Sequence, residues 1–220
     1  MKQAMTFLRK IKKNNNTPWM HAHKDEYLAA KAEFNFLIQE ILARVSLWDE
    51  KLPILEPKDT TFRFNRDIRF SDNKKPYKEN FASYISYDGK KGVLPGYYLH
   101  VSPTEVFVAG GLWYPEANEL TIVRRAIDHS GDELLEILNE KKFKKAFGEL
   151  PTEGSLKRIP KGFSADHEFA ELLKLKSFVV KKSFPVKDVT EKGFGKKVDE
   201  AFRLMKPFNH FLREIIKNPS

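Results

Sequence analysis

Basic side chains are unusually dense in the segment TFRFNRDIRFSDNKKPYK, residues 61–78. Guanidinium groups bind phosphate and carboxylate through paired hydrogen bonds, and a neighbouring carboxylate can orient them. If the segment is an extended strand, alternate residues share one face about 7 Å apart. The residue types therefore predict an anion site, whose candidate ligand-binding residues are Arg63, Arg66, Asp67, Arg69, Lys74 and Lys78.

A purely structural explanation of the same segment stays open. The three arginines can pair with Asp67, Asp72 and other carboxylates in a salt-bridge network that only braces the fold. Arg66 interrupts the alternation of apolar and polar residues, so either it is buried with a partner or the strand bends there.

A second set of chemical groups lies on the sequence GYYLHVSP, where Tyr98, His100 and Ser102 alternate and share a strand face. His100 is the candidate catalytic residue, a general acid or base that Tyr98 would orient, and Tyr98 is also a candidate ligand-binding residue. Ser102 lacks both a base within reach and the GxSxG elbow of a nucleophile. A histidine packed between strands explains the pattern as well.

A second basic loop, LKRIPKGF, carries Lys157, Arg158 and Lys161 between prolines and glycines. Arg158 is a further candidate ligand-binding residue if this loop folds over residues 61–78. The alternative is a solvated surface loop. Gly110-Gly111 follows a predicted strand and would allow a ligand or another backbone to come close, and a bulge or a turn explains the pair equally well.

Motifs for metals and cofactors are absent. The chain has no cysteine, and it contains neither GxGxxG nor GxxxxGK[ST]. His21 and His23 are two residues apart and point to different sides of a helix. We therefore expect no metal site and no cofactor.

The elements that must position these groups follow from hydrophobic periodicity. Helices are predicted over residues 25–47, beyond Pro115, and after Asp188 with a break near Pro207. Strands are predicted over 61–70, 81–87 and 177–184, with a hairpin turning at residues 102–104. The fold class is α+β: a mostly antiparallel central sheet flanked by N-terminal and C-terminal helices. Residues 1–220 are expected to form one domain.

The net charge of +9 is unevenly distributed. Residues 1–140 are neutral, whereas residues 141–220 hold 19 basic and 10 acidic side chains. Such asymmetry is typical of a polyanion-binding surface or of a lysine-rich solvated face. No apolar run is long enough for a membrane helix, and no secretory signal is present, which favours a cytoplasmic protein.

Four motifs occur in the order NNNTPWMHAHKDEY, FRFNRDIRFSDNKKPYK, GYYLHVSP with VAGGLWYP, and LKRIPKGFSADHEFAELLKLKSF. In this order they resemble an uncharacterised bacterial and fungal family, domain of unknown function 2461, over nearly the whole chain. Met20 departs from the pattern, which has an aromatic residue there. The resemblance implies a single soluble domain but no activity and no catalytic residues.

Two classes of function are therefore expected. The first is a pocket for a small phosphorylated or carboxylated ligand, with acid/base chemistry at His100. The second is a polyanion- or nucleic-acid-binding module that uses the basic region 141–220 and aromatic residues such as Trp113 and Tyr114. A non-catalytic interaction protein is a third alternative. The oligomeric state does not follow from the sequence.

Overall fold

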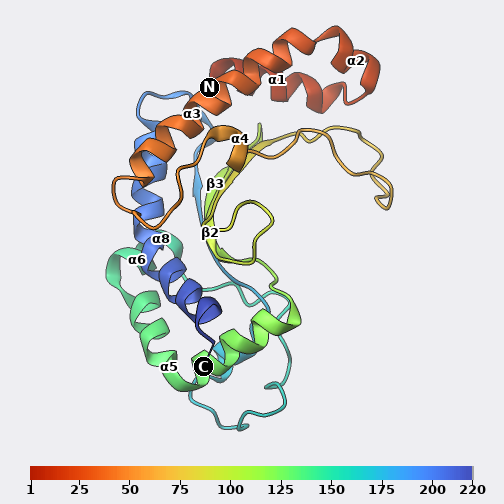
Figure 1. Cartoon of the computed structure of the whole chain (residues 1–220). Coiled ribbons are helices and arrows are strands. Elements are labelled where there is room, and N and C mark those ends of the chain that lie inside the picture. The colour runs from red at the N-terminus through yellow and green to blue at the C-terminus, as the bar shows by residue number, and fades with distance from the viewer. Residues whose placement is uncertain (220) are drawn as a thin grey trace. The chain divides into compact units, whose positions relative to one another are not determined.

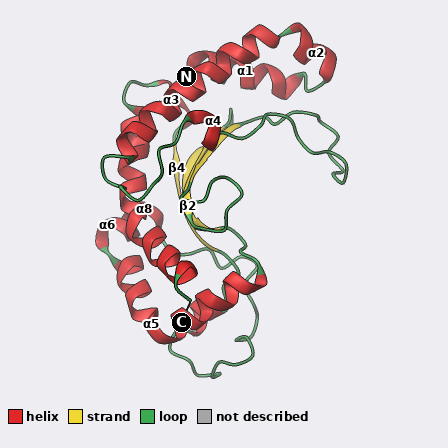
Figure 2. Cartoon of the chain, viewed as in Figure 1, coloured by secondary structure: helices red, strands yellow, loops and turns green. Residues whose placement is uncertain are grey.

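The computed structural model describes residues 1–219. The first part of the chain forms the helices α1 (Lys2–Lys13), α2 (Thr17–Ala22), α3 (Lys24–Val45) and α4 (Pro57–Thr60), followed by the strands β1 (Phe81–Ile85), β2 (Gly96–Val101) and β3 (Val106–Leu112) (Figure 1). The second part forms the helices α5 (Ala117–Asn139), α6 (Lys141–Phe147) and α7 (Ala170–Leu173), strand β4 (Phe178–Phe184), a short 3₁₀-helix (Val186–Thr190) and α8 (Phe194–Lys217) (Figure 2).

The four strands form one antiparallel sheet in the order β1-β2-β3-β4, and helices flank it. Strands β2 and β3 are joined by a tight turn, in which the Ser102 N–H donates to the Glu105 carbonyl oxygen at 2.9 Å. The α+β fold class predicted from the hydrophobic pattern is thereby confirmed. No helix within residues 1–219 combines the length and the apolar composition that crossing a membrane requires.

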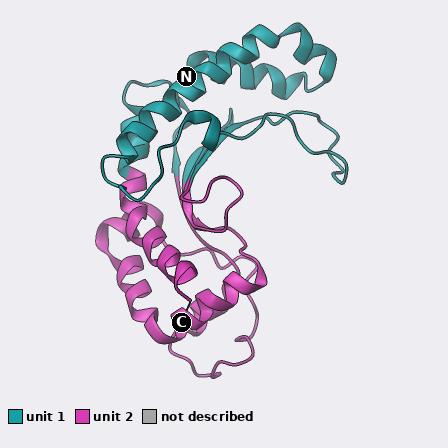
Figure 3. Cartoon of the chain, in the orientation of Figure 1, with its two compact units in different colours: residues 1–85, 98–108, 183–200 teal, residues 86–97, 109–182, 201–220 magenta. Residues whose placement is uncertain are grey.

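The chain divides into two compact units, each built from three segments (Figure 3). Unit 1 comprises residues 1–85, 98–108 and 183–200. Unit 2 comprises residues 86–97, 109–182 and the described residues from 201 onward. The organisation of the whole chain as one domain stays a prediction.

The core of unit 1 forms where α1 packs against α3. Buried side chains recur at helical spacing, with Met5, Leu8 and Ile11 on α1 and Ile38 and Ile41 on α3. Each helix therefore buries one apolar stripe against the other helix.

In unit 2, two glycine positions show how closely elements approach. Gly111 has φ of +110°, and a Cβ atom there would lie 1.9 Å from the carbonyl oxygen of Phe178 on β4. Gly131 on α5 faces Phe169, whose ring would lie 2.4 Å from an added Cβ. Of the two explanations of the Gly110-Gly111 pair, close approach of another backbone is the one that the structure shows.

Most predicted elements are confirmed, and two predictions were wrong. Residues 61–70 are not a strand, because they pair only through the isolated bridges Thr61–Ser83 and Asn65–Tyr77. Local side-chain hydrogen bonds compete there with a regular ladder. Helix α8 is not broken near Pro207 but runs through it. Its buried residues, such as Phe202 and Leu212, supply packing that outweighs the proline's cost of about 3 kcal/mol.

Candidate functional site

The segment that carries the arginine cluster folds back on itself, and we call residues 61–80 the basic hairpin. Backbone hydrogen bonds join its two arms, from Arg66 N–H to the Pro76 carbonyl at 2.9 Å and from Lys78 N–H to the Phe64 carbonyl at 2.8 Å. Asn15 holds the returning arm from outside. Its Nδ2 donates to the Tyr77 carbonyl, and its Oδ1 accepts from the Tyr77 N–H, both at 3.0 Å. The hairpin is thus fixed at its base within unit 1.

Aromatic packing anchors the same base. The Phe64 side chain is only 4% exposed, and its ring lies 5.2 to 5.8 Å from the rings of Phe7, Tyr27 and Phe81. By contrast, Phe70 at the far end is 97% exposed. The apolar residues of the segment therefore do not share one buried face, as a strand would require.

Four of the candidate residues form contacts inside the hairpin. Arg66 donates to the Lys75 carbonyl at 3.0 Å and to the Ser71 hydroxyl at 3.2 Å. Arg69 pairs with both carboxylate oxygens of Asp67, at 3.0 and 2.7 Å, which lowers the pKa of Asp67. The Lys74 ammonium donates to the Ile68 carbonyl at 3.3 Å. These contacts brace the hairpin, and a ligand-binding role of the four residues stays a prediction.

The two remaining basic candidates of the hairpin, Arg63 and Lys78, lie where its arms meet the sheet. The Lys78 Nζ lies 5.1 Å from the centre of the Phe62 ring. Burial and the nearby charge of Arg63 lower the pKa of Lys78. Neither side chain forms an ion pair with any residue among 1–219. Two positive charges are therefore held close together without an ion pair, and the Asp67 carboxylate on which Arg63 acts is already paired with Arg69.

Strand β2 presents Tyr98 and His100 on its half-exposed face, whereas Leu99 and Val101 are buried on the other. The Tyr98 hydroxyl lies 3.4 Å from the His100 Nδ1. The His100 ring stacks on Phe107 of β3, with the ring centres 4.7 Å apart. The predicted sharing of one strand face by Tyr98 and His100 is confirmed.

The Phe62 ring joins these groups to the hairpin, because it lies edge-on to Tyr98 at 6.3 Å. We call the set Arg63, Lys78, Phe62, Tyr98, His100 and Phe107 the cation–aromatic cluster, and all of it belongs to unit 1. Sequence reasoning missed Phe62 and Phe107 as site residues. The hairpin pattern of β2 and β3 was the signal for Phe107, because cross-strand neighbours share a face.

The Glu105 carboxylate influences Tyr98 electrostatically and lies near His100. Burial, and then the charge of Glu105, raise the pKa of Tyr98 to about 12. Tyr98 thus stays a neutral phenol near pH 7 and can donate a hydrogen bond. Histidine has an ordinary pKa near neutrality, and the Nε2 of His100 lies 3.7 Å from the Glu105 carboxylate. The catalytic role of His100 stays a prediction.

Other candidates fall outside this cluster. The Ser102 hydroxyl donates to the Glu105 carbonyl at 3.0 Å and accepts from the Glu105 N–H at 3.0 Å, so it stabilises the turn. Arg158 is exposed and belongs to unit 2. That its loop folds over residues 61–78 and adds to the same anion site stays a prediction. Residues 1–219 contain no group of three or more histidine, aspartate or glutamate side chains able to hold a metal ion.

The contacts of His167 in unit 2 define its tautomer. The His167 Nδ1 accepts from the Phe169 N–H at 3.0 Å, so the proton lies on Nε2. Nε2 donates to the Asp128 carboxylate at 2.7 Å. This arrangement ties the start of α7 to α5, which is a structural role.

The fold and the cluster define an α+β protein in which a basic hairpin meets an aromatic sheet face. The chain belongs to the family described as conserved hypothetical protein (DUF2461), which matches residues 3–211. The family resemblance seen in the four sequence motifs is thereby confirmed. Comparison with curated proteins and with solved structures gave no significant match.

Proposed function

We propose that unit 1 binds a small phosphorylated or carboxylated compound at the cation–aromatic cluster. The observation that carries this proposal is the pair Arg63 and Lys78. Burial and a like charge both disfavour the ammonium form of Lys78, as its lowered pKa indicates. A bound anion would stabilise both cations at once.

The aromatic part of the cluster supports the proposal in a second way. The Phe62 side chain is 37% exposed beside the Lys78 ammonium, so a ligand can contact the ring and the charge together. The Tyr98 hydroxyl is a neutral donor for an anionic oxygen. Pockets for small ligands combine apolar walls with a few polar groups in this manner.

Acid/base catalysis by His100 is the next step of the same proposal. The imidazole is held by the ring of Phe107 and lies near the hydroxyl of Tyr98 and the carboxylate of Glu105. Such contacts fix the orientation of a proton-transfer group. A cytoplasmic location belongs to the proposal too, and it is supported by the lack of cysteine.

Calorimetric titration at low salt tests the proposal, with inorganic phosphate, phenyl phosphate and citrate as probes. Lys78→Met and Arg63→Ala should each weaken the binding about tenfold or more, because each removes a charge-assisted contact. The matched controls are Lys12→Met and Arg9→Ala, exposed residues of α1 in the same unit, which should leave the affinity unchanged. The proposal fails if no probe binds, or if the variants and their controls behave alike.

Nucleic-acid binding is the second candidate, and one observation in unit 2 favours it. Trp113 is 75% exposed and lies edge-on to Tyr114 at 4.9 Å, in a chain whose excess positive charge follows it in sequence. Exposed aromatic rings stack on unpaired bases. Fluorescence anisotropy with a single-stranded oligonucleotide tests this candidate, because steep weakening with salt and a loss on Trp113→Ala are expected.

A further inference from the structure

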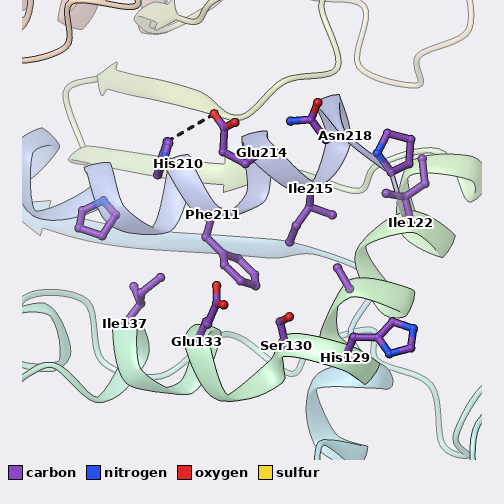
Figure 4. Close-up of a pocket in the computed structure, with 13 residues that line it drawn as sticks. Ile122, His129, Ser130, Glu133, Ile137, His210, Phe211, Glu214, Ile215 and Asn218 are labelled. Carbon is purple, nitrogen blue, oxygen red and sulfur yellow. Dashed lines mark ion pairs between the residues drawn. The ribbon is translucent and has the colours of Figure 1, made fainter.

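A pocket of about 510 Å³ lies within unit 2, between α5 and the C-terminal half of α8 (Figure 4). From α5, Ser130, Glu133 and Ile137 point toward α8. From α8, Phe211 and Ile215 point back toward α5. The pocket therefore has an apolar floor and one carboxylate that faces into it.

Each of the two helices carries an unusual residue at the pocket. Ser130 interrupts α5 with non-helical angles, φ −137° and ψ 31°. Pro207 lies inside α8, where its ring disturbs the preceding turn. Both residues line the pocket. Regular helices close such gaps by packing ridges into grooves, and α5 departs from regular helical geometry at the pocket itself.

The charged side chains that line the pocket include carboxylates but no lysine or arginine, in contrast to the positive net charge of the chain. None of its thirteen lining residues is a lysine or an arginine, although the net charge of the protein is +9. The Glu214 carboxylate is partly neutralised, because it accepts from the Arg213 guanidinium at 3.1 Å. Glu133, in contrast, forms no hydrogen bond or ion pair with any residue of the described chain.

We propose that this pocket binds a small organic cation, a protonated amine carried on an apolar body. Glu133 is its counter-ion, and the Ser130 hydroxyl accepts a hydrogen bond from the ammonium group. The Phe211 ring lines the same pocket and attracts the cation through its π face. Ile137 and Ile215 contact the apolar body. This site belongs to unit 2 and is independent of the anion site proposed in unit 1.

Benzylamine and benzyl alcohol form a matched pair of probes, because they share the apolar ring and differ in charge at neutral pH. In NMR titrations we expect benzylamine to bind about tenfold more tightly than benzyl alcohol, from the ion pair and the cation–π contact together. The ring C–H signals of His129 and His210, which line the pocket, should shift. The signal of His21 in α2 should not.

Glu133→Gln should abolish the preference for benzylamine and leave benzyl alcohol binding unchanged. Glu136→Gln is the matched control, since Glu136 is exposed on the same helix but does not line the pocket. Both residues are exposed, so both variants should keep the melting temperature of the wild type. The proposal is overturned if the two probes bind equally, if Glu133→Gln keeps the preference, or if the signal of His21 shifts and those of His129 and His210 do not.

Discussion

Replacing Asn15 with alanine should release the base of the basic hairpin. The Asn15 amide makes two hydrogen bonds to the backbone of Tyr77, which lies 62 positions further along the chain and is buried. A net hydrogen bond contributes about 1 kcal/mol, so the loss of two lowers the free energy of unfolding by about 2 kcal/mol. For a chain of this size, that corresponds to a fall in melting temperature of about 4 to 8 °C.

The assay is urea unfolding followed by circular dichroism, with hydrogen exchange of residues 61–80 as the local measurement. Asn15→Ala should speed exchange at Tyr77 and Lys78, because the arm that carries them is no longer held. Asn14→Ala is the control. The Asn14 amide is exposed and donates only to the Lys10 carbonyl of its own helix, so its loss should cost less than about 0.5 kcal/mol. Equal effects of the two substitutions would refute the reasoning.

Three further predictions concern single contacts. Gly111→Ala should lower the free energy of unfolding, measured by urea titration, by more than about 2 kcal/mol, because the added Cβ would overlap the Phe178 carbonyl. Gly89→Ala is the control. Gly89 also has a positive φ of +82°, but no atom lies within 4 Å of the added Cβ, so this substitution should cost less. Absorbance titration should show one tyrosine ionising near pH 12 that is absent in Tyr98→Phe. Because that pKa is raised from 10.0, the stabilisation by the neutral phenol is complete below pH 10 and is lost as the pH rises toward 12, so the Tyr98→Phe variant should lose less stability across that window. Arg66→Ala should speed amide hydrogen exchange in residues 66–76, because it removes the two hydrogen bonds of the Arg66 guanidinium. Arg69→Ala should not, since Arg69 contacts only exposed groups. Equal exchange rates in the two variants would contradict the bracing role of Arg66.

Long periodic elements could be predicted from the sequence alone. Helix α3 was predicted over residues 25–47 and is observed over Lys24–Val45, because its buried positions recur every three to four residues. The hairpin of β2 and β3 followed from alternation on both sides of Ser102. The predicted strand at 61–70 failed, since alternation over a short segment does not supply a neighbouring strand to pair with.

The three consecutive asparagines at 14–16 also show that sequence predicts local contacts but not contacts with distant segments. Their polarity predicts a stop between helices, and Asn14 does end α1 while Asn16 begins α2. Asn16, for example, caps α2 by accepting from the Trp19 N–H at 2.9 Å. The bond of Asn15 to Tyr77 depends on a segment far away in the chain, and no local pattern encodes it.

For the candidate site, the sequence by itself determined the residue types: a basic segment, a tyrosine and a histidine on one strand face, and no thiol. Only the tertiary structure decided which charges are compensated. It pairs Arg69 with Asp67 and gives Arg66 backbone and hydroxyl partners, while Arg63 and Lys78 form no ion pair within residues 1–219. The physical reason is distance, because the interaction between two charges depends on their separation and burial in the folded chain rather than on their spacing in the sequence.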